Sequence, residues 1–340
     1  MPLKFITEHR AVSFLDPFRE FARTDLTIEV RHDPLTGDTA RVLSFRARPL
    51  ELIDHQVFID RSQERPCPFC PGNLERMTTR YLPEDLPEGR LTRGGATLFP
   101  NAFPYEAMNA VLVLTPEHYL RPEEFTPELL ANALLLAAEG FRHLAKGLNY
   151  ASVNWNYMMP AGAGLVHPHF QLAAGQKPTR FQAELLRRAR AHARKAGGAD
   201  LAADYLEATR LGKARWLGKL GPLGWCTPFA PRAIYDVLGL APAGKGLLDL
   251  KPAQVEKVAQ GIARVLGFFA AEKVGAFNMA LFTGLQPDGE QPLLLRLVSR
   301  VDIPPMGIDE INYFEKLHDE MITFLPPEES AQRLRATWKA

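Results

Sequence analysis

The sequence predicts an α+β fold built from two similar halves. Strand, helix and strand patterns follow one another in the same order in each half of the 340 residues, which indicates an internal duplication. The composition is that of an ordinary globular protein, with 46% hydrophobic and 23% charged residues. The length suits two domains of roughly 100–200 residues each. Together these features exclude a disordered, collagen-like or membrane-dominated chain.

In the first half, the apolar run 109–114 stops just before a proline and predicts a buried strand. Thr126 and Pro127 form a typical helix start, and apolar periodicity continues to Gly147, which predicts a long helix. Two further strands and a helix with a solvated basic face are expected over 151–157, 166–173 and 181–196.

The second half repeats this order of elements. The stretch 197–221, which contains several glycines, is the most linker-like part of the chain and separates the two halves. The expected elements after it are strands over 224–229 and 233–240, a long helix over 252–273, strands over 276–282 and 292–299, and two closing helices over 309–323 and 327–338.

The charges of the chain nearly cancel, since 40 Lys and Arg residues stand against 39 Asp and Glu residues. This balance argues against a nucleic-acid partner but allows a local pocket for a small anion. Charges interrupt the first ten residues before an apolar run develops, so we expect no signal peptide. The longest apolar stretch is shorter than the roughly 20 residues of a membrane span. We therefore expect a cytoplasmic protein with no membrane partner.

Cys67 and Cys70 are separated by two residues in a proline-bounded turn. Three interpretations of this pair stay open: two ligands of a zinc ion, a thiol redox pair, or plain turn cysteines. The redox interpretation needs a helix start that lowers a thiol pKa, and Pro71 followed by Gly72 argues against such a helix. The third cysteine, Cys226, lies apart and is expected to be a small buried hydrophobe.

His118 follows the end of the strand predicted over 109–114. On its own it would be an exposed loop histidine. A zinc ion needs four ligands, however, and the cysteine pair supplies only two of them. His118 is therefore also a candidate third ligand.

His167, His169 and Gln171 alternate along a predicted strand, which places their side chains on one face. Two imidazoles and an amide within an apolar segment all need polar partners, which favours a functional site. The small residues from Gly162 to Gly164, just before them, allow backbone N–H groups to approach an anion. They do not form a dinucleotide fingerprint, and the chain has no Walker loop.

In combination, these residues resemble galactose-1-phosphate uridylyltransferase and its relatives, a branch of the histidine-triad superfamily. The resemblance runs from about Arg46 to Arg335. It implies two fused histidine-triad-like halves, with a mainly antiparallel sheet and helices packed on it. Residues 1–196 would carry the zinc and catalytic motifs, and 197–340 would be a degenerate copy. The matching motifs are Cys67-x-x-Cys70, Asn101-x-Phe103, Pro116-x-His118, Asn156 and His167-Pro-His169-x-Gln171.

The resemblance also implies roles for single residues. His169 would be the nucleophile, held by the backbone carbonyl of His167, and Gln171 would donate its amide to a phosphate oxygen. One structural zinc ion would be bound by Cys67, Cys70, His118 and His167. The implied substrate contacts are Arg46 and Arg48 with the diphosphate, Asn101 and Phe103 with the base and ribose, and Asn156 and the backbone near Gly164 with the phosphates. For the two arginines, a plain surface role is an equal alternative.

The chain departs from the family pattern at three positions that we interpret as touching the substrate. Ala102 stands where relatives often have an acidic residue, Phe170 replaces a small residue, and Gly164 replaces a phosphate-binding serine. Some relatives have a second iron or zinc site in the C-terminal half. The only histidine after His192 is His318, so we expect this second site to be absent.

By resemblance, the expected activity is exchange of a nucleoside monophosphate between a nucleoside diphosphate hexose and a hexose 1-phosphate, as in galactose metabolism. A phosphorylase of a nucleotide sugar or a dinucleoside polyphosphate, with phosphate as acceptor, is the first alternative. A zinc-stabilised binding protein without catalysis is the second. Hydrolysis fits less well, because hydrolytic members usually have a third histidine at the position of Gln171. The family is dimeric, with sites completed by the neighbouring subunit, so we expect a homodimer.

Overall fold

A ten-stranded sheet forms the centre of the molecule in the computed structural model, which describes residues 3–46, 55–286, 290–303, 308–309 and 312–338. All neighbouring strands in this sheet are antiparallel. The strands are β4 (Leu91–Arg93), β5 (Ala96–Pro100), β6 (Met108–Val113), β7 (Tyr150–Tyr157), β8 (His169–Gly175), β9 (Trp216–Leu220), β10 (Leu223–Cys226), β11 (Asp236–Leu240), β12 (Ala276–Gly284) and β13 (Leu294–Arg300).

The sheet contains the internal duplication in its strand order. From one edge to the centre the order is β4-β5-β6-β8-β7, and from the other edge it is β9-β10-β11-β13-β12. The halves join where β7 pairs with β12, from Tyr157 opposite Phe277 to Tyr150 opposite Gly284. The predicted α+β fold of two fused halves with a mainly antiparallel sheet is therefore confirmed.

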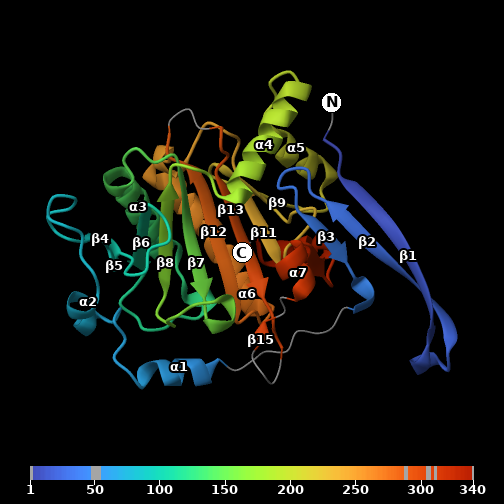
Figure 1. Cartoon of the computed structure of the whole chain (residues 1–340), viewed down its shortest axis with the longest axis horizontal. Helices are drawn as coiled ribbons and strands as arrows, with labels where there is room; N and C mark the ends of the chain where they lie inside the picture. Colours follow the sequence, from blue (N-terminus) through green and yellow to red (C-terminus); the bar gives the residue numbers. More distant parts are fainter. Residues whose placement is uncertain (1–2, 47–54, 287–289, 304–307, 310–311, 339–340) are drawn as a thin grey trace.

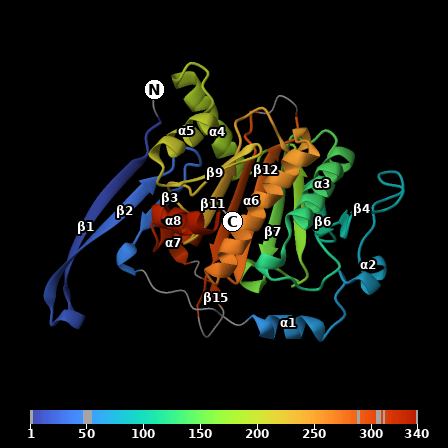
Figure 2. The same ribbon diagram turned by 180° about the vertical axis from the view of Figure 1, so that it is seen from behind.

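Two long helices, α3 (Pro127–Leu144) and α6 (Pro252–Ala271), cover one face of the sheet (Figure 2). Both begin with a proline in the first turn, and the Thr126 hydroxyl caps α3 by accepting a hydrogen bond from the Leu129 N–H. Their apolar faces form the main core with residues such as Trp155 of β7 and Phe277 of β12. The opposite face of β8 and β7 is left for polar side chains.

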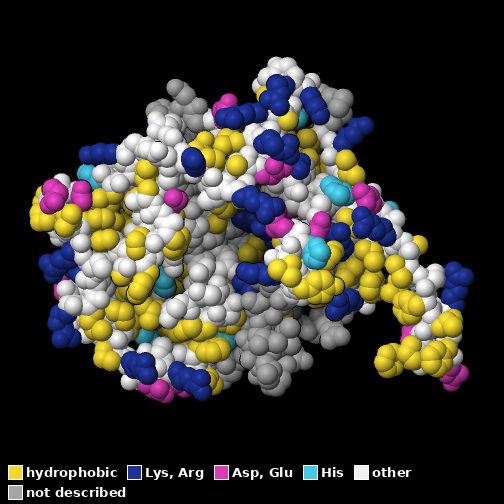
Figure 3. All heavy atoms as spheres, viewed as in Figure 1, with side chains coloured by type: hydrophobic (Ala, Val, Ile, Leu, Met, Phe, Trp, Pro, Cys, Tyr) yellow, Lys and Arg dark blue, Asp and Glu magenta, His cyan; other side chains and the backbone are white. Residues whose placement is uncertain are grey.

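A smaller sheet lies beside this body. It contains β1 (Ile6–Asp16), β2 (Ala22–His32), β3 (Thr39–Val42) and the parallel strand β16 (Met321–Thr323). Because β3 pairs only with Glu29–His32 of β2, most of the β1–β2 hairpin projects as a two-stranded arm (Figure 1). Apolar side chains line this arm, as Figure 3 shows, and the Phe18 side chain at its tip is 97% exposed.

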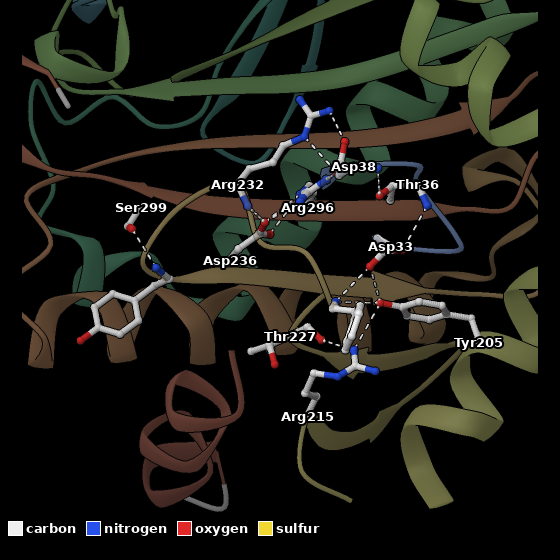
Figure 4. A network of polar contacts seen from close by, with 12 residues as sticks. Asp33, Thr36, Asp38, Tyr205, Arg215, Thr227, Arg232, Asp236, Arg296 and Ser299 are labelled. Carbon is white, nitrogen blue, oxygen red and sulfur yellow. Dashed lines mark hydrogen bonds and ion pairs between the residues drawn. The ribbon is translucent and has the colours of Figure 1, made fainter. Parts of the chain in front are cut away.

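A buried polar network joins the β2–β3 turn to the C-terminal half of the large sheet (Figure 4). The Arg296 guanidinium on β13 donates to Asp236 on β11 at 3.0 Å and to Asp38 at 2.6 Å. Burial alone would raise the pKa of the Asp38 carboxyl, but the charges of Arg296 and Arg232 outweigh it and hold the pKa below its usual range. In the same turn, Asp33 accepts a hydrogen bond from the Tyr205 hydroxyl at 2.8 Å.

The remaining elements differ in part from the expectations. The stretch 197–221, expected to be a linker, contains a helix and strand β9. The helix expected over 309–323 ends early, because Asp319 adopts a left-handed conformation and β16 follows. The other elements are the helices α1 (Gln56–Gln63), α2 (Pro71–Met77), α4 (Arg180–Lys195), α5 (Leu201–Gly212), α7 (Tyr313–His318) and α8 (Pro327–Trp338), the strands β14 (Asp302–Ile303) and β15 (Ile308–Asp309), and the short 3₁₀ turns η1 (Pro17–Arg19), η2 (Ser44–Arg46), η3 (Pro122–Glu124), η4 (Met159–Ala161) and η5 (Leu247–Asp249).

Across the part of the chain that the structure describes, no helix is both long enough and apolar enough to cross a membrane. The predicted helices over 126–147 and 252–273 are confirmed as α3 and α6. Cys226 is fully buried at the end of β10, as expected for a small hydrophobe. The division of the chain after residue 196 stays a prediction.

Candidate active site and metal centre

Cys67, Cys70, His118 and His167 form one cluster, with their ligand atoms all within 4.8 Å of one another. The Cys70 Sγ atom lies 3.3 Å from His118 Nδ1 and 3.7 Å from His167 Nδ1, and Cys67 Sγ also lies 3.7 Å from His167 Nδ1. A sulfur and a nitrogen bound to the same tetrahedral zinc ion would be about 3.6 Å apart. The donor set and its spacing therefore fit a metal ion such as zinc.

Both sulfurs come from the turn that leads into α2. Cys70 occupies the N-cap position of α2, its N–H donates to the Cys67 carbonyl at 3.3 Å, and the Asn73 side chain donates to the same carbonyl at 2.9 Å. The interpretation that Pro71 and Gly72 argue against a helix here is wrong. Proline is favourable in the first turn, because its missing N–H would have no helical partner there.

The cysteine environment favours metal binding over thiol redox chemistry. Burial, and then the neighbouring Cys67 thiol, raise the pKa of the Cys70 thiol to about 11. A reactive redox thiol needs the opposite shift. A metal cation shared by the two sulfurs would favour their thiolate forms.

The two imidazoles direct their Nδ1 atoms at the sulfurs. His167 Nε2 donates to the Thr115 carbonyl at 2.8 Å, which leaves the Nδ1 lone pair directed at the cluster. His118 Nε2 lies 2.7 Å from the Ser62 hydroxyl, so His118 is not an isolated loop histidine. Burial lowers the pKa of His167 to about 4, and it also lowers the pKa of His118. Both rings are thus kept neutral, which is the form that binds metals.

His169 lies at the first position of β8, with only 7% of its surface exposed. Its Nδ1 atom lies 2.8 Å from the His167 carbonyl oxygen. A carbonyl can only accept, so Nδ1 carries the proton and the Nε2 lone pair stays available. Burial lowers the pKa of His169, which favours the neutral ring. The strand expected over 166–173 begins at His169, so His167 precedes it in the segment that carries Pro168.

Gln171 and Asn156 extend the polar face beside His169. Gln171 lies two residues after His169 in β8 and so shares its face, and its Oε1 atom accepts a hydrogen bond from the Tyr105 hydroxyl at 2.6 Å. The Asn156 Oδ1 atom on β7 accepts a hydrogen bond from Asn278 at 2.8 Å. Gly164 is exposed, with open space where a side chain would be.

Asn101 and Phe103 belong to the loop between β5 and β6. The Asn101 Oδ1 atom accepts a hydrogen bond from the Phe103 N–H at 3.0 Å, and its Nδ2 atom donates to Asn109 at 2.9 Å. These bonds fix the shape of the loop and leave the Phe103 ring 85% exposed. The ring is thus free to contact a ligand.

Of the two arginines predicted to bind the diphosphate, the structure describes only Arg46. Arg46 lies in η2 after β3, where its guanidinium sits over the Phe324 ring at 5.2 Å. Within the described residues, no hydrogen bond or ion pair links Arg46 to His169. Arg48 lies outside the described residues.

One interpretation of the family departures is wrong. Phe170 does not touch the substrate face, because alternation along β8 directs its side chain into the helix-covered core. Its ring is fully buried against Trp155, with the ring centroids 5.2 Å apart. Ala102 is exposed in the loop after β5.

Three further residues of this face were missed from sequence. Tyr105 contacts Gln171, Asn278 contacts Asn156, and Arg300 donates to the Asn278 Oδ1 atom at 3.0 Å. Asn278 could have been predicted to belong to the site, since it is a polar residue inside an apolar strand. Tyr105 could not have been predicted from the sequence, because only the folded loop brings it to β8.

Comparisons with known proteins give one sequence relative and a set of similar folds. No family model matches the chain. An uncharacterized protein of Archaeoglobus fulgidus is 30% identical over 312 residues, which are 92% of each chain. Among solved structures, an ADP-glucose phosphorylase from Arabidopsis thaliana with bound ADP-glucose has a TM-score of 0.71 at 17% identity and covers 91% of this chain and 98% of its own.

Two more solved structures have the same fold. A galT-like protein from Arabidopsis thaliana has a TM-score of 0.69 at 16% identity, covering 90% of this chain and 98% of its own. A uridylyltransferase has a TM-score of 0.63 at 19% identity, covering 91% and 98%. At these identities the likeness concerns the fold.

Proposed function

The chain belongs to the family of the Archaeoglobus fulgidus protein and has the fold of the uridylyltransferase branch of the histidine-triad superfamily, and from this premise we propose that it is a nucleotidyltransferase. Its donor would be a nucleoside diphosphate hexose, and its covalent intermediate a nucleotidyl group on His169. The observation that carries the proposal is the Nδ1 contact of His169 with the His167 carbonyl, which leaves Nε2 as a neutral nucleophile.

In the first step, the Nε2 lone pair of His169 attacks the α-phosphorus of the donor. A phosphorus–nitrogen bond forms, and the bond from phosphorus to the bridging oxygen breaks. The electron pair leaves with that oxygen, so a hexose 1-phosphate departs and the nucleotidyl group stays on the enzyme. As positive charge develops on the ring, the His167 carbonyl stabilises it through the Nδ1 proton.

Gln171 would stabilise the charge on the phosphorus. Its side chain is on the same face of β8 as His169, two residues along the strand. Its Oε1 atom already accepts the Tyr105 hydroxyl, so the Nε2 atom is the end left to donate to a non-bridging oxygen. Asn156 and the open backbone at Gly164 offer further space and donors for the phosphates.

We assign a structural role to the metal. A zinc ion bound by Cys67, Cys70, His118 and His167 would hold the turn before α2 against the segment that leads into β8. The His167 side chain would then be tethered while its own carbonyl aims His169. The two functions use different atoms of one residue.

In the second step, an acceptor oxygen attacks the phosphorus and the phosphorus–nitrogen bond breaks, which restores neutral His169. A hexose 1-phosphate as acceptor gives a new nucleotide sugar. The second candidate function has inorganic phosphate as acceptor and is a phosphorylase. It is favoured by the fold similarity to an ADP-glucose phosphorylase, at a TM-score of 0.71.

The first test is to incubate the protein with UDP-glucose, ADP-glucose or diadenosine tetraphosphate and to measure its intact mass. A nucleotidyl adduct with one donor identifies the base, and His169→Ala is expected to abolish it. The exposed residue His143 provides the matched control His143→Ala, which is expected to behave like the unmodified protein.

The acceptor is identified by adding galactose 1-phosphate, glucose 1-phosphate or inorganic phosphate to the isolated adduct. Discharge by a hexose phosphate supports the transferase, and discharge by phosphate alone supports the phosphorylase. Tight nucleotide binding without an adduct would instead support a non-catalytic binding protein.

We further propose that the protein is a homodimer whose contact includes the β1–β2 arm. A two-stranded ribbon without further layers is marginally stable in water, and β1 has no described partner strand on its outer edge. Exposed apolar side chains at its tip, Phe18 and Phe21 among them, would be covered in such a contact.

A further inference from the structure

Tyr105 and Gln171 meet across the open face of the sheet. The Tyr105 hydroxyl donates to the Gln171 Oε1 atom at 2.6 Å, although the two residues are 66 positions apart in the chain. Tyr105 is 65% exposed and belongs to the loop between β5 and β6, whereas Gln171 lies on β8 next to the proposed nucleophile. The contact therefore joins a surface loop to the centre of the candidate site.

Hydrogen bonds connect the base of the loop that contains Tyr105 to β8. The Asn101 N–H donates to the Asn109 carbonyl at 3.0 Å, and the side chains of the same two residues are joined at 2.9 Å. The Asn109 side chain in turn donates to the backbone carbonyl of Leu172 at 2.7 Å. Leu172 directly follows Gln171, so the base of the loop is hydrogen-bonded to β8 next to the glutamine.

A glutamine amide can present either its oxygen or its nitrogen to a ligand. In the structure the Tyr105 hydroxyl donates to the amide oxygen, and in this arrangement the amide nitrogen, which can only donate, is the end left for a ligand. The neighbouring Asn154 does not settle the amide orientation, since its Nδ2 atom donates to the Gln171 backbone carbonyl and to Ser152. Among the described residues, the Tyr105 hydroxyl is the group bonded to the Gln171 side chain.

We propose that Tyr105 is a positioning residue that orients the Gln171 amide so that its nitrogen faces the phosphate. This inference rests on the proposed nucleotidyl transfer. Tyr105 itself takes no part in bond making or breaking. Its hydrogen bond holds the amide in the observed orientation before the donor binds, which lowers the cost of ordering the site.

Two substitutions isolate this effect. Tyr105→Phe removes the hydroxyl and keeps the exposed ring, so folding is expected to be unchanged. The loss of one hydrogen bond is expected to slow single-turnover nucleotidylation of His169 by about 3- to 10-fold, with donor affinity changed by less than about twofold. Gln171→Ala removes the donor itself and is expected to slow the step by about 100-fold. Tyr313→Phe, at another exposed tyrosine, is the matched control.

The decisive comparison is the double variant. If Tyr105 acts through Gln171, adding Tyr105→Phe to Gln171→Ala changes the rate by less than about twofold, because the group it positions is gone. Independent effects that multiply in the double variant would overturn the proposal. Equal rates for Tyr105→Phe and the unmodified protein would overturn it as well.

A second measurement does not depend on turnover. In ¹⁵N-labelled protein, the side-chain amide signals of Gln171 are assigned by their disappearance in Gln171→Glu. Tyr105→Phe is expected to shift these signals while Tyr313→Phe leaves them in place, and unmoved signals in Tyr105→Phe would contradict the inference. If the unmodified protein forms no adduct with any donor, the proposed function fails, whereas the amide signals still decide whether Tyr105 orients Gln171.

Discussion

At the scale of the residue, His169 meets the two requirements of a nucleophilic imidazole. One ring nitrogen must be pinned as a donor, and the other must keep its lone pair at the working pH. The carbonyl of His167, 2.8 Å from Nδ1, meets the first requirement. Burial, which disfavours the charged ring, meets the second.

The lowered pKa of His169 predicts the pH dependence of the first step. Only the neutral ring can attack, and a lowered pKa keeps it neutral at pH values below the ordinary histidine value of about 6.5. The single-turnover rate of adduct formation is therefore expected to keep more than half of its pH 8 value at about pH 6.5 and to fall further at lower pH. A rate that has already fallen to half at neutral pH would show that burial does not lower the pKa of His169.

At the scale of the element, the turn before α2 and the segment before β8 are separate pieces of chain that the four-ligand cluster would join. Cys67 and Cys70 come from the first, and His167 comes from the second. The His169 position depends on this junction, because its anchor is the His167 carbonyl. Loss of one metal-binding residue should therefore lower the stability of the protein. The chemical step should be affected only indirectly, because the His167 carbonyl would hold His169 less firmly.

Cys67→Ser tests this order of effects. The variant is expected to retain less zinc and to unfold about 5 °C or more below the unmodified protein, because removal of a ligand weakens a metal site that contributes folding energy. Its adduct rate at a temperature where it is folded is expected to fall less than that of Gln171→Ala. Metal analysis and calorimetry measure the first two quantities, and Cys226→Ala, at the cysteine outside the cluster, is expected to keep the full metal content. A folded Cys67→Ser with full metal content would contradict the ligand set.

The two long helices could be predicted from sequence because their signals are local. Thr126 and Pro127 mark the start of α3, and a 3.6-residue apolar period runs along its length. Helix α5 was not predicted from the sequence, because the glycines that flank it suggest a linker. Its buried residues Leu201, Tyr205 and Thr209 nevertheless recur at helical spacing. The early end of α7 depends on the left-handed backbone of Asp319, which no periodicity reveals.

The candidate site also contains residues that the sequence predicts and contacts that it does not. The Cys67 and Cys70 pair and the histidines near β8 are short motifs, so their chemistry is visible in the sequence. The contact of Tyr105 with Gln171 depends on how a loop folds over a strand 66 residues away, and the sequence carries no sign of it. The direction of Phe170 could have been predicted, because alternation requires it to oppose its neighbours His169 and Gln171.

In the molecule as a whole, buried ion pairs connect the small sheet to the large one. Arg296→Ala would leave Asp38 and Asp236 buried without their shared cation, which costs about 3–5 kcal/mol. Calorimetry is expected to show a melting temperature lower by about 5 °C or more. Arg187→Ala, at an exposed position on α4, is the control and is expected to melt within about 1 °C of the unmodified protein. A stable Arg296→Ala would mean that the network contributes little.

The projecting arm predicts how the molecule assembles. In size-exclusion chromatography with light scattering, the protein is expected to have twice the mass of one chain. The double substitution Phe18→Ser with Phe21→Ser is expected to yield monomers, because it removes apolar surface from the arm tip. Leu317→Ser, at an exposed position on α7, should remain dimeric. An unmodified protein that is monomeric at all tested concentrations would contradict the assembly.

The proposed mechanism depends on a covalent bond between the nucleotidyl group and the Nε2 atom of His169. The most direct measurement is a single-turnover reaction in which the adduct is digested and the modified peptide is sequenced by mass spectrometry. We expect one nucleotidyl group per chain, located on His169 and removed by acid, with an equal amount of hexose 1-phosphate released. A nucleotidyl group located on any other residue, or turnover that continues unchanged in His169→Ala, would contradict the mechanism.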